Sequence, residues 1–319
     1  MWVQKVPGGG VAHLAFSPGG ETLYTLDTGG WLTAWDLASR GSRRLSRIES
    51  QDGWFSSRIY ALADGETVVT RMDVVGYWEA TLNQDGTIAE PPVVFTLWDV
   101  TTGQVLTRLN PPGLHQGSHA QVLPDGRLYY LGPGSKEIMG WNLRTESPEP
   151  SLGIREMTSD IFSFKLSTGG QFVCTLFQGN GPPVLHQVVT GTELRNPLPI
   201  NGIANAYKIS FSPDDRTVAL FSTPPPRISL WDIRNRTIRA AGIPSDLPVQ
   251  FAWNPTTPMF AALNPNHMLT LFSSDTGEPL RSLDFALGRS VRCVAFSPDG
   301  LTCAVGGSNK QFAVFDVDL

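Results

Sequence analysis

Two histidines four residues apart are the first place to look for chemistry in this sequence. His115 and His119 have the spacing of a pair of zinc ligands, but they lie beside Pro111-Pro112 with no third ligand close by in the sequence. The other histidines are separated from this pair and from one another: His13, His186 and His267. A metal centre is therefore not expected.

Motifs that assemble a catalytic centre are missing from the sequence. It has no Gly-x-Ser-x-Gly elbow, no His-Glu-x-x-His, and no glycine-rich loop ending in Gly-Lys-Ser/Thr. Carboxylates fall in predicted turns, as at Asp64, Asp125 and Asp299. We expect a protein that is not an enzyme, with no catalytic residue and no cofactor.

The three cysteines have no metal-binding spacing. Cys174, Cys293 and Cys303 lie in predicted strands, and we interpret them as buried free thiols. Cys293 and Cys303 are expected on neighbouring strands of one sheet, which leaves a bridge between them as the alternative.

An aromatic residue followed by an acid recurs about every 43 residues. Four copies are clear: Trp35-Asp36, Trp98-Asp99, Trp231-Asp232 and Phe315-Asp316. Three weaker copies fall between them: Trp141-Asn142, His186-Gln187 and Phe272-Ser273. Seven copies of one unit predict a repeat architecture, and such architectures serve mainly to bind.

Turn-forming residues keep the same period. Ser17-Pro18-Gly19-Gly20 and Ser297-Pro298-Asp299-Gly300 show the pattern: Pro presets φ, Ser or Asp accepts a local hydrogen bond, and Gly takes a left-handed conformation. In the first unit these turns separate predicted strands at 11–16, 22–26 and 31–35, and a fourth, outer strand follows in most units. The sequence predicts seven small four-stranded sheets.

Small sheets with two apolar faces must stack on one another, and seven of them close around an axis. The large aromatics of the third strands, Trp35, Trp98 and Trp231, are then packing residues between sheets. The expected fold is an all-β, seven-bladed β-propeller that forms a single domain over residues 1–319.

These repeats resemble the WD40 family of β-propellers over nearly the whole chain. The segments 291–300 and 11–36 are the closest to the family pattern, and the unit with His186-Gln187 departs most from it. The resemblance implies seven blades, no cofactor and a platform for partners. The family's Gly-His dipeptide before the first strand is absent or displaced here, so some blades are expected to be held mainly by apolar packing instead of the family's buried polar network.

The two ends of the chain are expected to meet. The last unit stops before any fourth strand, while residues 2–7 precede the first unit with nothing of their own to pair with. If this N-terminal segment supplies the missing outer strand, the last blade is composite and no interior sheet edge stays unpaired.

The second unit carries an insertion between its second and third strands. Gly65 and Trp98 are 33 positions apart, whereas Gly20 and Trp35 are 15 apart. The extra residues read as a projecting hairpin with an Asp-Gly turn at Asp85-Gly86. We expect Tyr77 and Trp78 in this insert to contact a partner; the alternative is that they cover the neighbouring blade.

One face of the ring should collect the turns between second and third strands and the starts of the first strands. Aromatic and basic residues are expected there as a partner-binding rim: Trp31, Trp54, Phe55, Tyr77, Trp78, His119, Tyr207, Asn266, His267, Arg289 and Lys310. The favoured function is a non-enzymatic protein–protein interaction scaffold that uses this rim and the insertion.

The alternative function is a small-ligand-binding or hydrolytic propeller that uses the axial channel. That reading needs polar side chains on the first strands, and the inward candidates are mostly apolar or small. The exceptions are His13, Lys165, Lys208 and Arg292.

The composition argues against two classes of binding partner, nucleic acid and membrane. A formal net charge of −5 gives no electrostatic footprint for nucleic acid. No run approaches the roughly 18 apolar residues of a membrane helix, and the N-terminus lacks a basic stretch followed by an apolar one. We expect a cytoplasmic protein that binds other proteins, either as a monomeric ring or as a subunit of a hetero-complex.

Overall fold

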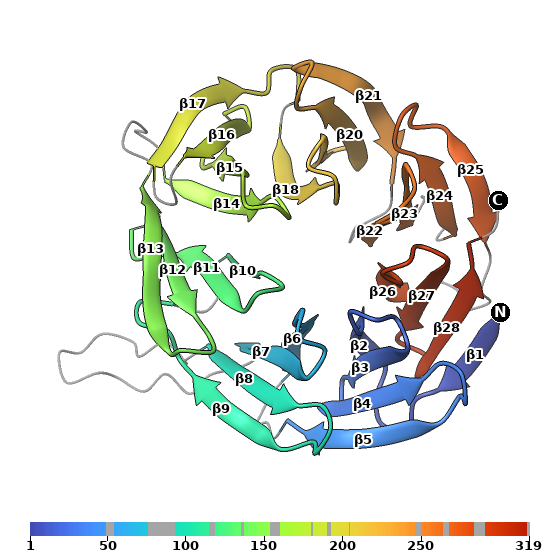
Figure 1. Cartoon of the computed structure of the whole chain (residues 1–319). Helices are drawn as coiled ribbons and strands as arrows, with labels where there is room; N and C mark the ends of the chain where they lie inside the picture. Colours follow the sequence, from blue (N-terminus) through green and yellow to red (C-terminus); the bar gives the residue numbers. More distant parts are fainter. Residues whose placement is uncertain are drawn as a thin grey trace.

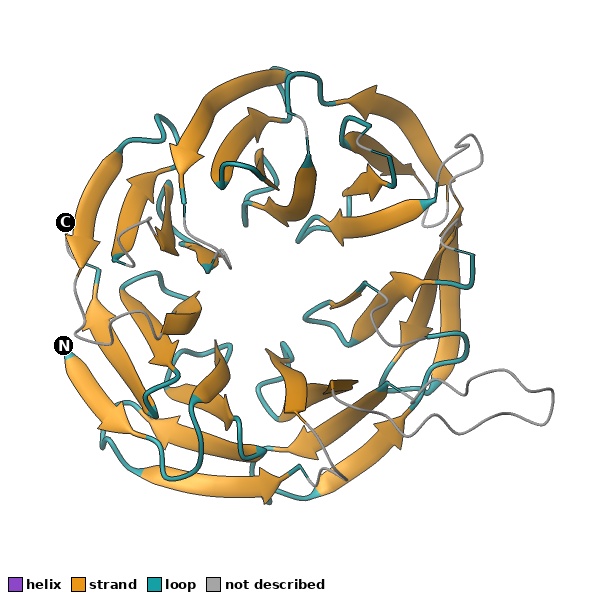
Figure 2. Ribbon diagram, turned by 180° about the vertical axis from the view of Figure 1, so that it is seen from behind, coloured by secondary structure: helices purple, strands orange, loops and turns teal. Residues whose placement is uncertain are grey.

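The computed structural model is a ring of antiparallel sheets around an axis (Figures 1 and 2). It describes residues 1–48, 54–75, 93–114, 119–134, 137–153, 160–179, 181–189, 193–203, 205–245, 250–263, 268–283 and 291–317. These residues form strands β1 to β28, four to a blade in seven blades. The predicted seven-bladed β-propeller is confirmed.

Each blade is an antiparallel meander that runs from the axis outwards. The innermost strands of blades 1 to 7 are β2 (Val11–Phe16), β6 (Trp54–Ala61), β10 (Ala120–Val122), β14 (Ile161–Leu166), β18 (Ala206–Phe211), β22 (Phe251–Trp253) and β26 (Val291–Phe296). The second strands are β3 (Thr22–Asp27), β7 (Thr67–Val75), β11 (Arg127–Leu131), β15 (Phe172–Phe177), β19 (Thr217–Ser222), β23 (Met259–Leu263) and β27 (Thr302–Gly307).

The two outer positions of each blade follow in the same order. The third strands are β4 (Trp31–Asp36), β8 (Val94–Asp99), β12 (Glu137–Asn142), β16 (Val184–Val189), β20 (Arg227–Asp232), β24 (Leu269–Ser273) and β28 (Gln311–Asp316). The outermost strands are β5 (Ser42–Arg47), β9 (Val105–Leu109), β13 (Ser147–Gly153), β17 (Glu193–Pro199), β21 (Thr237–Pro244), β25 (Pro279–Leu283) and, in blade 7, β1 (Trp2–Lys5).

Local turn chemistry sets the ends of these strands. In blade 1 the Ser17 amide donates to the Thr22 carbonyl at 2.8 Å, and Gly20 sits at φ 85°, which is unstrained for glycine. The carboxylate of Asp99 accepts from the amides of Thr101 and Thr102, at 2.7 and 2.8 Å. The acid that follows the third-strand aromatic therefore caps the next turn, as the sequence predicts.

Among the described residues, the core consists of seven apolar clusters, and each one lies between two neighbouring blades. Trp35 belongs to the cluster between blades 7 and 1, Trp98 to the one between blades 1 and 2, and Trp231 to the one between blades 4 and 5. Their exposed fractions are 2%, 2% and 3%. The prediction that these tryptophans pack between sheets is confirmed.

Buried hydrogen bonds lie beside the apolar packing in two of the blades. The Trp35 indole donates to the Thr25 hydroxyl at 2.9 Å, and the Trp98 indole donates to the Thr70 hydroxyl at 2.8 Å. Blades 1 and 2 therefore contain a buried Thr–Trp hydrogen bond, whereas in blade 5 the apolar Leu220 occupies the threonine position. The sequence shows which residues are present but not that Thr and Trp, on adjacent strands, point the same way.

The ring closes through its N-terminal strand. β1 pairs antiparallel with β28, with Trp2 opposite Val314, and the Val6 amide donates to the Lys310 carbonyl at 2.8 Å. Both chain ends lie on the same side of the ring in the two ribbon views. The predicted composite last blade is confirmed. The outer strands of blades 3 and 4 are also joined, by one parallel pairing between Gly153 and Glu193.

An antiparallel meander gives the ring two distinct faces. We call the upper face the one that carries the starts of the innermost strands and the turns between second and third strands; the lower face carries the other turns. On the lower face, hydrogen bonds join neighbouring turns. The Asp215 carboxylate accepts from the backbone amides of Thr168 and Gly169, each at 2.9 Å, and the side-chain amide of Asn254 donates to the Gly300 carbonyl at 2.8 Å.

Candidate interaction surfaces

A stacked aromatic and two arginines stand on the upper face of blade 1. Arg44 and Arg47, both exposed on β5, place their guanidinium carbons 4.5 and 5.6 Å from the ring centre of Trp31. We call Trp31, Arg44 and Arg47 the rim cluster. Cation–π stacking of this kind holds long side chains in a fixed arrangement while their charged edges stay in water.

Hydrogen bonds hold the turn that precedes Trp31. One Asp27 carboxylate oxygen accepts from the amides of Gly29 and Trp31, at 2.8 and 3.0 Å. The Arg47 Nε donates to the Gly29 carbonyl at 3.4 Å, which anchors the guanidinium over the same turn. The rim cluster therefore stands on a hairpin whose turn is held by side-chain hydrogen bonds.

The other described rim residues lie in two different settings. Lys310 is exposed in the turn between β27 and β28, at φ 64°. His119 and Tyr207 lie at the inner wall: the His119 ring meets Phe164 edge-on at 5.1 Å, and Tyr207 packs against the cluster between blades 5 and 6. Among the rim residues whose side chains are described, Trp31 and Lys310 lie at turns of the upper face, and His119 and Tyr207 lie at the inner wall.

Several of the predicted rim residues cannot be placed. Tyr77, Trp78, Asn266, His267 and Arg289 lie outside the described residues. Trp54 and Phe55 begin β6, of which only the backbone is described at these positions. The insertion of the second unit falls between the end of β7 at Val75 and the start of β8 at Val94, where the sequence predicts it.

A second surface lies at the axis. Side chains on the innermost strands that are exposed or half-buried include His13 on β2, Arg58 on β6, Phe162 and Lys165 on β14, Lys208 on β18 and Arg292 on β26. We call these six residues the axial surface. Phe162 is 53% exposed, so solvent reaches the inner wall of the ring.

Protein surrounds these axial cations closely enough to change their titration. Burial lowers the pKa of Lys165 to about 8, with Arg58 and Lys208 adding like-charge repulsion. Burial and Arg58 lower the pKa of Lys208 to about 8 in the same way. Although the Lys208 side chain as a whole is exposed, its amine lies 5.3 Å from the Phe221 ring.

The histidines near the axis stay neutral at neutral pH. Burial and then Arg58 lower the pKa of His13 to about 4, and the His13 Nδ1 accepts from the Ile59 amide at 3.4 Å. Burial, followed by Lys165, Arg58 and Arg71, lowers the pKa of His119 to about 3. The His119 Nδ1 is buried and makes no hydrogen bond to the described residues.

Sequence reasoning missed Arg58 and the two stacking arginines. The first turn of a blade opens with a residue whose backbone amide donates across the turn, as Ser17, Leu62 and Ser212 do. Arg58 lies four positions before Leu62. His13 and Lys208 occupy that same fourth position in their own blades. Alignment on the turns would have found Arg58, whereas nothing in the sequence indicates that Arg44 folds over Trp31.

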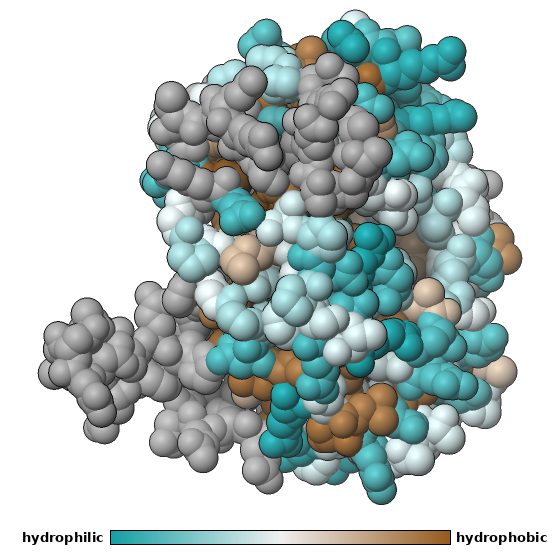
Figure 3. Space-filling model, turned by 60° about the vertical axis from the view of Figure 1, so that its left-hand side comes forward, coloured by the Kyte–Doolittle hydropathy of each residue, from teal (hydrophilic) through white to brown (hydrophobic). Residues whose placement is uncertain are grey.

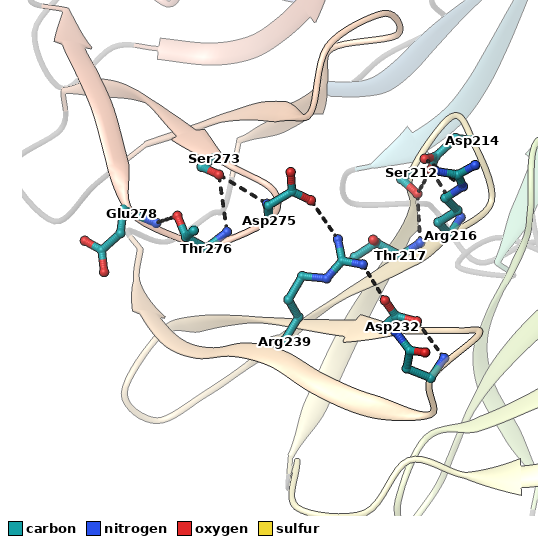
Figure 4. Close-up of polar contacts among 11 residues, drawn as sticks. Ser212, Asp214, Arg216, Thr217, Asp232, Arg239, Ser273, Asp275, Thr276 and Glu278 are labelled. Atoms are coloured by element: carbon teal, nitrogen blue, oxygen red, sulfur yellow. Dashed lines mark hydrogen bonds and ion pairs between the residues drawn. The ribbon is translucent and has the colours of Figure 1, made fainter.

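An outer groove of about 600 Å³ lies between blades 5 and 6, lined by residues 240–244 and 276–279. A β-carbon on Gly277 would approach that of Ala240 to 2.7 Å, at a φ of 75°, so glycine is required there. Beside it Arg239 bridges Asp232 of its own blade and Asp275 of blade 6, the latter at 3.0 Å (Figure 4). This side of the ring is held by an interblade ion network.

Other surface features are dispersed. The side of the ring that carries blades 2 to 4 is mostly hydrophilic, with separate apolar patches (Figure 3). Within the described ranges, no three His, Cys, Asp or Glu side chains are arranged to hold a metal. No helix among the described residues is long and apolar enough to cross a membrane.

The cysteines are free and buried. Cys174, Cys293 and Cys303 form no disulfide, which confirms the first interpretation and not the bridge. Cys293 and Cys303 do lie on neighbouring strands, but Cys293 stands opposite Gly306 and Cys303 opposite Phe296. Burial raises the pKa of Cys293 to about 12.

Comparison with known proteins agrees with this architecture. Residues 277–316 match the family described as WD domain, G-beta repeat. That segment begins just before β25, the outer strand of blade 6, and ends with β28 of blade 7. One sequence repeat therefore spans two blades.

One relative and one solved structure are informative. Cytoplasmic dynein 1 intermediate chain of Drosophila melanogaster is 30% identical over 123 residues, which make up 37% of this chain and 18% of that protein. A chain in the crystal structure of the mitotic checkpoint complex matches with a TM-score of 0.69 at 13% identity, covering 99% of this chain and 91% of that chain. At this identity, the match to the checkpoint-complex chain shows that the two chains share a fold and nothing more.

Proposed function

We propose that this chain, a WD40-type β-propeller, is a non-enzymatic scaffold that binds a protein partner through the upper rim and the insertion of blade 2. Propellers of this type generally hold other proteins. The observation that carries the proposal is the rim cluster, an indole stacked by two exposed guanidinium groups on the upper face.

Such a cluster has the composition of a binding hot spot. Tryptophan and arginine are the residues whose truncation most often costs binding energy at protein interfaces. Trp31 is already stacked and its turn is braced by Asp27, so little side-chain freedom remains to be lost on binding. The exposed guanidinium edges favour a partner that presents carboxylates or backbone carbonyls.

The two faces of the ring support the choice of rim. Lower-face turns use their polar groups to bond neighbouring blades, as Asp215 and Asn254 do. The upper face carries the insertion and the arginine-stacked tryptophan. We place the partner site there, with these residues as its candidates: Trp31, Trp54, Phe55, Tyr77, Trp78, His119, Tyr207, His267, Arg289 and Lys310.

The proposed function also includes the domain organisation, the classes of partner and the location of the protein. Residues 1–319 act as one domain that works as a monomeric ring or as a subunit of a hetero-complex. Neither nucleic acid nor membrane is its partner. A cytoplasmic location is proposed as well; the name of the dynein relative supports it, although the matched region is 18% of that protein.

Affinity purification with the intact chain as bait tests the proposal. Two variants carry the test: Trp31→Ala with Arg44→Gln and Arg47→Gln, and Tyr77→Ala with Trp78→Ala. Arg216→Gln, next to a lower-face turn, is the control for a lost surface arginine. We expect both variants to lose partners that the intact chain and the control retain. Identical partner sets for all four baits would rule out the rim.

A further inference from the structure

A pocket opens at the lower, outer corner between blades 4 and 5. Its volume is about 310 Å³, and its apolar lining comes from Phe172, Leu185, Leu198 and Ile233. All four belong to, or pack against, the apolar cluster between these two blades. Leu185 is buried, whereas the other three side chains are half-buried. The core of the ring therefore reaches solvent at this corner.

A cation, Arg236, lines the same pocket. It lies four residues after Asp232, the last residue of β20, in the turn between the third and fourth strands of blade 5. Its φ of 57° is left-handed, and Gly103 and Gly277 fill the same turn position in blades 2 and 6 at φ 74° and 75°. A left-handed φ has no steric cost for glycine but does for arginine. Blade 5 therefore bears a conformational cost at a residue that lines the pocket.

Blade 3 shows what a side chain at this turn position can bind. Glu146, at φ 55°, lies four residues after Asn142 and accepts from the Thr107 hydroxyl at 2.8 Å. Thr107 belongs to β9, so the contact is to the outermost strand of the preceding blade. Arg236 holds the corresponding place beside blade 4, but its guanidinium has no hydrogen bond or ion pair with the part of the chain that the structure describes. Its charge is free to bind a ligand.

The acids close to this turn in the fold already have partners. The Ile233 amide donates to the Arg216 carbonyl at 2.9 Å, which places residues 214–216 beside the pocket. Asp215 accepts two backbone amides, and Asp214 and Asp232 pair with Arg216 and Arg239 (Figure 4). Arg234, exposed like Arg236, also has no ion pair with a described residue. Within the described ranges, this corner thus has two positive charges without a counter-charge.

These features indicate the chemistry of the ligand. An apolar group in the pocket would remove half-buried side chains from water, and guanidinium groups bind carboxylates through charge-assisted, often bidentate hydrogen bonds. The volume is at the lower end of the roughly 300–1,000 Å³ of ligand pockets, which suits one large side chain better than a folded element. Two cations that lie two residues apart favour more than one carboxylate.

We propose that this corner binds a short segment of a protein in which a large apolar residue is flanked by acidic residues. The apolar side chain enters the pocket between blades 4 and 5, and the carboxylates bind Arg234 and Arg236. A polyanion without an apolar group would leave the pocket unfilled. The site lies on the opposite face of the ring from the rim cluster, so it does not depend on the function proposed for the rim.

Fluorescence anisotropy with the full chain tests the proposal. The probes are labelled eight-residue peptides of Gly and Ser with Glu-X-Glu at the centre, where X is Leu, Ile, Met or Phe. One control peptide has Ser at X, and a second keeps Leu at X but has Gln for both Glu. The variant Arg236→Gly removes the cation, and Arg40→Gly is its matched control, because Arg40 holds the same turn position in blade 1 at φ 58°.

We expect at least one apolar probe to bind the intact chain, Arg236→Gly to bind it about tenfold more weakly, and Arg40→Gly to bind it with unchanged affinity. Melting temperatures show whether both variants are folded. Glycine relieves the steric cost of a left-handed φ, which offsets the freedom that it loses on folding, so neither variant should melt clearly below the intact chain. The bound probe should raise the melting temperature of Arg40→Gly more than that of Arg236→Gly.

Four results would overturn the proposal: no apolar probe binds, a control peptide binds as well as the probes, the two variants bind a probe equally, or octanoate binds and no peptide does. The last result would make the pocket a site for small amphiphiles. The rim variant with Trp31→Ala, Arg44→Gln and Arg47→Gln should bind the probe as the intact chain does. Weaker binding by that variant would contradict a site separate from the rim.

Discussion

The ring of Trp2 meets the ring of Phe312 edge-on, with 5.3 Å between their centres. Trp2 also lies edge-on to Trp35, at 6.4 Å, so one side chain from the first strand of the chain contacts both blade 7 and blade 1. Edge-to-face aromatic pairs stabilise beyond their buried area. The N-terminal strand thus closes the ring by its side chains as well as by its backbone pairing with β28.

Removing this contact should loosen the closure. We expect Trp2→Ala to destabilise the fold by about 2–3 kcal/mol, less than for a fully buried tryptophan because Trp2 is half-buried. Deletion of residues 2–7 should cost more, since it also removes the β1–β28 pairing. Urea unfolding measures both changes, with Val3→Ala, 42% exposed on the same strand, as the control. An unchanged unfolding midpoint in the deletion would contradict closure through β1.

The bond between Trp35 and Thr25 should contribute to the stability of blade 1. Thr25→Val keeps the shape of the side chain but leaves the buried indole N–H without an acceptor, and we expect a loss of about 1–3 kcal/mol. A double-mutant cycle with Trp35→Phe isolates the hydrogen bond, because the double variant has no unpaired donor. Additive effects of the two substitutions would show that the bond is not formed.

The ion network at Asp232 should make stability depend on acidic pH. Burial alone would raise the pKa of Asp232, but the Asn235 amide and the Arg239 guanidinium outweigh it and lower the pKa. A carboxylate of lowered pKa stabilises the fold fully above its unfolded value, about 3.9, and loses this contribution as pH falls through the lower folded value.

We therefore expect Asp232→Asn to destabilise the protein at pH 7, with the difference from the unsubstituted chain shrinking as pH falls below about 4. Melting temperatures of both chains, recorded from pH 7 down to pH 3, measure this difference in stability. Asp275→Asn is the matched control, because Asp275 binds the same arginine with its side chain 60% exposed, and its effect should be smaller. If the melting temperatures of Asp232→Asn and of the unsubstituted chain differed by the same amount at pH 3 and at pH 7, the lowered pKa of Asp232 would be refuted.

The three cysteines should resist alkylation in the folded protein. Burial raises the pKa of Cys174, of Cys293 (to about 12) and of Cys303, and the thiolate is the reactive form. We expect iodoacetamide at pH 8 to leave the native chain unmodified while free glutathione reacts to completion. The chain unfolded in guanidinium should gain three adducts by mass spectrometry. Rapid modification of the native chain would show that a cysteine is accessible.

Most of the fold could be predicted from the sequence because the signals are local. The period of the aromatic–acid pairs, the turn residues such as those at 17–20, and the short apolar runs each specify a strand, a hairpin or a repeat without reference to distant parts of the chain. The composite last blade followed from counting strands at the two ends. The acids placed in turns, such as Asp99, cap them as expected.

What only the tertiary structure decided depends on how blades face one another. Thr25 and Trp35 are ordinary strand residues in the sequence, and only the pairing of β3 with β4 brings donor and acceptor to 2.9 Å. Arg58 and Lys165 are more than a hundred residues apart, and only closure of the ring around its axis puts their charges within reach of each other. Periodicity determines which strands form, whereas the convergence of side chains from separate blades is set by the geometry of the closed ring.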